Sequence, residues 1–134
     1  MFNKEKINSF EKITLSLSGM RIREEYEIIR IDDRAQLSRY TIMYSDGKDK
    51  RRLEQRVDAD CDEIIGILNN CNILKWDGFC GKNPPGVLDG TMFSFEAKVN
   101  EERTIHARGS NNFPKNYWEF QNALYDILRR DEAE

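Results

Sequence analysis

The segment from residue 91 to residue 128 constrains the fold of this chain more than any other. Within 91–100, every second residue is apolar, as in a strand with one buried face: Phe93, Phe95, Ala97 and Val99. Residues 103–109 continue this pattern, and a loop over 110–115 leads into a segment with helical apolar spacing: Tyr117, Phe120, Leu124, Ile127 and Leu128. Because the two strands and the helix each have one apolar side, we expect them to pack together.

Four further strands are predicted ahead of this unit by alternating apolar and polar residues: 12–18, 26–31, 36–45 and 51–57. Asp46 and Gly47 separate the last two and tolerate the positive φ of a tight hairpin. A helix is predicted over 60–72, where Asp60 and Glu63 have the spacing of a capping box. We therefore expect an α+β fold: an antiparallel sheet of four to six strands with two helices packed on one face.

The size and charge of the chain restrict the classes of protein to which it can belong. Its 134 residues suit a single domain over 1–134, in which residues 1–11 form either a mobile tail or a short helix. The net charge of -3 argues against a nucleic-acid partner. No apolar run approaches the ~20 residues of a membrane span, so we expect no membrane contact and a cytoplasmic location.

The sequence offers no pattern for a metal, a cofactor or a nucleotide. The three cysteines (Cys61, Cys71 and Cys80) do not have the spacing of a zinc site and fit reduced thiols of a cytoplasmic protein. A single histidine, His106, and scattered carboxylates provide no cluster of ligands. We expect no metal, no cofactor and no catalytic residue.

If the chain has a small-molecule or hydrolytic site, the long aperiodic segment over 79–90 is where we expect it, because loops of this length are often functional. A loop folded back over the strand that contains His106 could bring a thiol close to an imidazole. Polar groups ahead of the closing helix could add an anion site. The residues of this hypothesis are Trp76, Asp77, Cys80, Asp89, His106, Arg108, Ser110 and Asn111.

The second half of the chain resembles small bacterial α+β domains of unknown role. The resemblance rests on two Asp-Gly turns, a strand pair, the Gly109-Ser110-Asn111 segment, Pro114 and the aromatic residues of the closing helix. The two turns are Trp76-Asp77-Gly78 and Leu88-Asp89-Gly90. The resemblance implies a bacterial origin, and it brings no reaction, substrate or site residue.

The leading functional hypothesis is a non-catalytic module that binds another protein. The strand over 36–45 places apolar residues on both of its faces, so one face needs a cover from outside the core. We expect the partner surface at Tyr40, Ile42 and Tyr44, and the partner is either a second copy of the chain or a different protein. The alternative is the site under the 79–90 loop.

Overall fold

The computed structural model describes residues 5–19, 23–82 and 91–132. Most of the predicted loop over 79–90, including Asp89, lies outside the described residues. In the described part the strands are β1 (Phe10–Ser18), β2 (Arg23–Ile31), β3 (Arg34–Ser45), β4 (Lys48–Asp60), β5 (Phe79–Gly81), β6 (Met92–Val99) and β7 (Arg103–Ser110). The helices are α1 (Cys61–Asn70), the 3₁₀ helix η1 (Ile73–Trp76) and α2 (Tyr117–Glu132).

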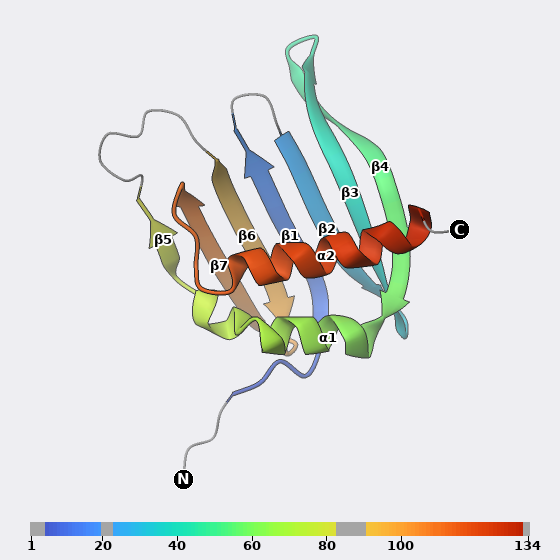
Figure 1. Ribbon diagram of the computed structural model, residues 1–134, viewed down its shortest axis with the longest axis vertical. Coiled ribbons are helices and arrows are strands. Elements are labelled where there is room, and N and C mark those ends of the chain that lie inside the picture. Colours follow the sequence, from blue (N-terminus) through green and yellow to red (C-terminus); the bar gives the residue numbers. More distant parts are fainter. Residues whose placement is uncertain (1–4, 20–22, 83–90, 133–134) are drawn as a thin grey trace.

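The strands form one seven-stranded sheet in the order β4-β3-β2-β1-β6-β7-β5 (Figure 1). All neighbouring strands are antiparallel except β5 and β7, which are parallel. The α+β class and the six strands predicted from alternation are confirmed, whereas the expected range of four to six strands was too small. The seventh strand, β5, has only three residues, too few to show a period.

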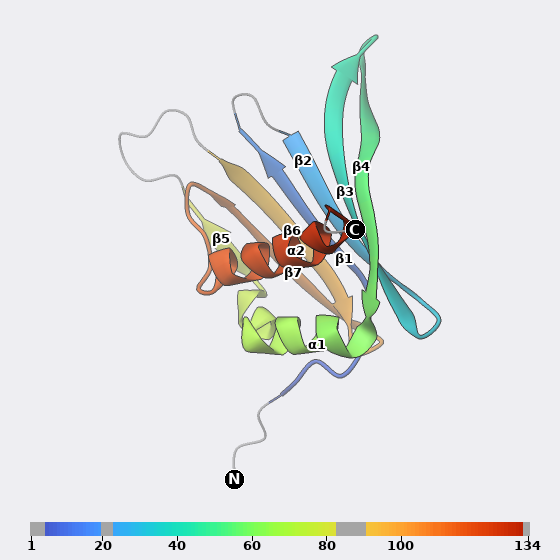
Figure 2. The ribbon, with the colours of Figure 1, turned by 45° about the vertical axis from the view of Figure 1, so that its right-hand side comes forward.

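The helices are arranged less simply than expected. Helix α2 crosses one face of the sheet at a steep angle to the strands, from β7 toward β4, whereas α1 runs beside it along the lower margin of the sheet (Figures 1 and 2). We call the side of the sheet under α2 the helix face and the opposite side the open face. The prediction of two helices on one face is therefore confirmed only in part, because α1 packs at the edge of that face.

A cluster of aromatic rings forms the centre of the core. The indole of Trp76 lies with its centroid 5.0 Å from the ring of Phe95 and 5.5 Å from the ring of Phe120, and each of these residues is at most 1% exposed. The ring of Tyr117 packs against Phe93 at 5.3 Å. The closing helix thus packs on the last strand pair as the sequence predicts, and Leu124, Ile127 and Leu128 carry its buried stripe toward the other strands.

The predicted capping box at the start of α1 is wrong. Asp60 occupies the position before the helix, but its side chain makes no capping hydrogen bond. The carboxylate of Asp60 instead accepts a bond of 2.6 Å from Arg34, and Glu63 pairs with Arg130 of α2. Both carboxylates have arginine partners from distant parts of the chain, which the local spacing of a capping box does not reveal.

Candidate functional site

Three of the residues predicted for a loop site share the open face at one edge of the sheet. Cys80 of β5 pairs in register with Arg108 of β7, and His106 lies two residues before Arg108 in β7. Phe79 packs on the core, so Cys80 points to the other side of the sheet. His106 lies opposite Glu96, with 3.6 Å between Nδ1 and the carboxylate, and both side chains are 64% exposed.

The remaining residues of that hypothesis have contacts that stabilise the fold. Trp76 is buried and donates its indole N–H to the carbonyl of Lys115 at 3.0 Å. The carboxylate of Asp77 accepts the backbone N–H of His106 at 3.1 Å, and the side-chain oxygen of Asn111 accepts that of Thr91 at 2.9 Å. Ser110 ends β7 opposite Met92. The structure therefore brings Cys80, His106 and Arg108 to one exposed surface and uses Trp76, Asp77 and Asn111 to hold the strands around it.

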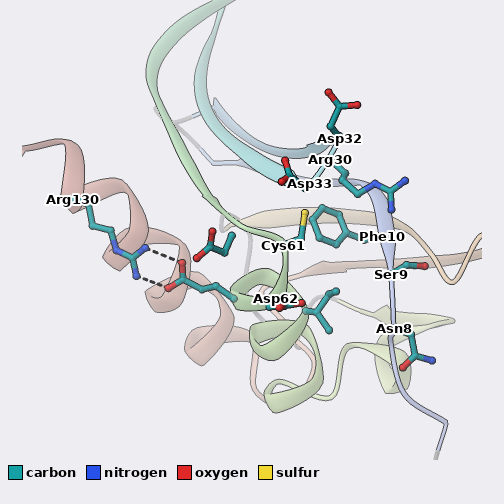
Figure 3. A pocket seen from close by; sticks show the side chains of 12 residues that line it. Asn8, Ser9, Phe10, Arg30, Asp32, Asp33, Cys61, Asp62 and Arg130 are labelled. Atoms are coloured by element: carbon teal, nitrogen blue, oxygen red, sulfur yellow. Dashed lines mark hydrogen bonds and ion pairs between the residues drawn. The ribbon is translucent and has the colours of Figure 1, made fainter.

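One cleft lined by described residues has a volume of about 730 Å³, and Figure 3 shows its side chains from close by. It opens between the start of β1, the β2–β3 turn, the junction of β4 with α1 and the end of α2. Its lining residues are Asn8, Ser9, Phe10, Arg30, Asp32, Asp33, Asp60, Cys61, Asp62, Glu63, Ile65 and Arg130. Five carboxylates face two guanidinium groups, so the cleft is acidic.

The groups in this cleft are not arranged for nucleophilic chemistry. Burial raises the pKa of the Cys61 thiol, so its reactive thiolate form is disfavoured at neutral pH. Arg130 donates two hydrogen bonds to Glu63, at 2.8 and 2.5 Å, and this pairing lowers the pKa of that carboxyl group. His106, the only histidine, does not line the cleft. Within the described ranges, no group of three or more His, Cys, Asp or Glu residues is placed to hold a metal ion.

The partner surface predicted at Tyr40, Ile42 and Tyr44 lies on the β3–β4 hairpin, which extends beyond the other strands at the end of the sheet opposite α1 (Figure 1). The exposed fraction is 73% for Tyr44, and Ile42 is half-buried. Tyr40 is only 7% exposed. The guanidinium carbon of Arg51 lies 4.1 Å from the centroid of the Tyr40 ring, and Arg56 donates a hydrogen bond of 3.0 Å to its hydroxyl group. The chain itself therefore covers Tyr40 and leaves Tyr44 open.

A further apolar residue of this surface was missed by sequence reasoning. Leu53 pairs with Tyr40 across the hairpin and is 44% exposed. The sequence marks Leu53 as an aliphatic residue of the fourth strand, which suggests a core position. A shift of register between Arg39 and Tyr40 changes the pairing on β4, so that Leu53 lies on the open face while Val57 packs on the core.

Most of the arginines on the hairpin are paired. Arg51 lies 3.2 Å from Glu25 and 3.6 Å from Glu27, Arg52 bonds Glu54, and Asp49 bonds Arg23. The Arg23 guanidinium lowers the pKa of Asp49 by hydrogen bonding. Three cations of β4 have no carboxylate partner among the described residues: Lys48, Lys50 and Arg56. Arg56 bonds only the hydroxyl groups of Ser38 and Tyr40.

Comparisons with known proteins identify no family for this chain. No protein-family model matches it, and no curated protein matches it significantly. Among the described residues, no helix is both long and apolar enough to cross a membrane.

Proposed function

We propose that this protein is a non-catalytic interaction module and that the β3–β4 hairpin is its docking surface. The observation that carries the proposal is the position of β4. Its thirteen residues form one outer strand of the sheet, and no described strand pairs with its free side. The backbone N–H and C=O groups along that side can bond an added polypeptide strand.

The side chains around this edge support the same proposal. Tyr44, Leu53 and Ile42 give the hairpin partly exposed apolar area, and the guanidinium groups of Arg51 and Arg56 contact the neighbouring Tyr40. Tyrosine and arginine are enriched among residues that dominate the energy of protein interfaces. A catalytic role has less support, because burial raises the pKa of the Cys61 thiol and the His106 side chain is 64% exposed beside Glu96.

A site-specific photo-crosslinker tests this proposal. The amino acid p-benzoylphenylalanine is placed at position 53 in the full chain, and the matched control carries it at position 104, an exposed site on β7. We expect one discrete protein adduct from position 53 in extracts of the source cells and none from position 104. An excess of the wild-type chain should suppress the adduct, and an excess of the Tyr44→Ala variant should suppress it less. Equal labelling from both positions, or no adduct at position 53, would refute the docking surface.

A further inference from the structure

We infer that the partner segment received by β4 is an extended, acidic polypeptide strand that pairs with the half of β4 nearest the hairpin turn. This inference rests on the proposed function and specifies the chemistry of the partner. It concerns residues 48–56, which contain five of the chain's basic residues and two acidic ones.

The shape of the molecule leaves this half of β4 accessible. Helix α2 crosses the sheet near the lower half of β4, and the upper part of the hairpin stands clear of both helices in two views (Figures 1 and 2). The contact of α2 with this strand includes a hydrogen bond of 3.4 Å from the side chain of Gln55 to the carbonyl of Leu128, which marks where the helix meets the strand. Toward the turn from Gln55, a new strand would meet no described element.

The positions of the unpaired cations define the charge of the partner. Lys48 and Lys50 are two residues apart, so their side chains lie on the same side of the strand, where they pair with Ser45 and Met43. In an added antiparallel strand, the Cβ of a residue directly opposite one of these lysines would lie about 4.5–5.5 Å from the lysine Cβ. Acidic residues at alternate positions of the partner would therefore meet both lysines, and apolar residues at the other positions would face Leu53.

The same charges disfavour a second copy of this hairpin as the occupant. If the upper halves of two β4 strands paired with each other, five basic residues of each copy would meet a segment with the same five basic and only two acidic residues. Like charges on neighbouring strands are destabilising. Basic side chains on an outer strand are a common protection against self-pairing. A strand protected in this way against its own copy remains complementary to an acidic strand.

A polypeptide fits this edge better than a nucleic acid does. The edge presents backbone carbonyl groups as well as N–H groups, and a phosphate has only acceptor oxygens to offer them. Several of the hairpin guanidinium groups that could bind phosphate are already paired, with Glu25 and Asp49 among their partners.

Fluorescence anisotropy with the full chain provides the test. The probe is a labelled ten-residue peptide that alternates glutamate with valine, and the comparison probes are the same peptide with lysine for glutamate and a twelve-residue oligothymidylate. We expect the acidic peptide to bind at least tenfold more tightly than either comparison probe, and to weaken as salt is raised. Hydrogen exchange should slow at amides of residues 48–56.

Charge-reversal variants locate the binding site. The double variant Lys48→Glu with Lys50→Glu should lower the affinity for the acidic peptide at least tenfold. The matched control is Lys75→Glu with Lys115→Glu, which makes the same change of charge at two exposed lysines away from β4 and should leave the affinity within twofold.

Three results would overturn the inference: equal affinity for both peptides, tighter binding of the oligonucleotide, or a wild-type chain that sediments as a dimer with its β4 amides already protected. None of these results decides the outcome of the crosslinking experiment at position 53, which tests the docking surface separately. An adduct at that position without preference for the acidic peptide would retain the docking surface and reject the acidic partner.

Discussion

The two ends of the sheet differ in how the chain uses its aromatic residues. At the end formed by β6, β7 and η1, Trp76, Phe95 and Phe120 are enclosed by one another and by α2. On the β3–β4 hairpin, Tyr40 lies under the guanidinium group of Arg51 and Tyr44 is mostly exposed. We conclude that the end formed by β6, β7 and η1 provides most of the stability. Exposed side chains of the β3–β4 hairpin can be substituted with little loss of stability.

The strongest way to test this comparison is to remove the central ring of the buried end. Trp76→Ala should lower the free energy of unfolding by about 3–5 kcal/mol, because a large cavity would remain among rings that cannot close it. Urea denaturation followed by circular dichroism measures the effect.

The matched control for this variant is Trp118→Ala, since Trp118 is 60% exposed in the same neighbourhood. Its loss should lower the free energy of unfolding by under about 1 kcal/mol. Equal losses from the two tryptophans would contradict the assignment of the stabilising end.

A smaller effect should follow from adding a methyl group at the buried end. A Cβ at Gly109 would overlap the backbone oxygen of Asn112 and lie 2.7 Å from the ring of Phe93. Gly109→Ala should therefore destabilise the chain by about 1–3 kcal/mol, measured as a lower urea midpoint.

Gly66→Ala provides the comparison for this prediction. Gly66 lies inside α1 with no atom within 4 Å of an added Cβ, so alanine should stabilise the helix by about 0.5–1 kcal/mol. A Gly109→Ala variant that is as stable as the wild type would show that the contact between β7 and residue 112 is loose.

The smallest effect on stability is expected at the hairpin. Tyr44→Ala should change the free energy of unfolding by no more than about 0.5 kcal/mol, because the side chain is 73% exposed and its loss leaves no cavity. The same urea titration checks this result. A loss above about 2 kcal/mol would mean that Tyr44 belongs to the stabilising part of the molecule.

The elements with a regular period could be predicted from the sequence. The alternation of Phe93 to Val99 and the helical spacing of Phe120 and Leu124 assign these side chains to the core, and their burial confirms the assignment. The short connection between β6 and β7 also favours the register that places Glu96 opposite His106, because a short turn fixes the pairing of a hairpin.

Other features of the candidate sites depended on residues far apart in the chain. Strand β5 exists because Phe79 to Gly81 meet β7, and three residues carry no period of their own. Tyr40 has two contacts that its own strand does not reveal: Arg51 lies over its ring and Arg56 donates a hydrogen bond to its hydroxyl group. Leu53 lies on the open face through a shift of register that the local sequence does not mark.

The sequence by itself determined the α+β class, six of the seven strands and both long helices, because hydrophobic periodicity acts within each segment. Only the tertiary structure decided that β4 is an outer strand, that the acidic cleft forms at its end, and that Lys48 and Lys50 have no carboxylate partner among the described residues. The physical reason is that these properties depend on which strands and side chains become neighbours, and that is set by packing of the whole sheet.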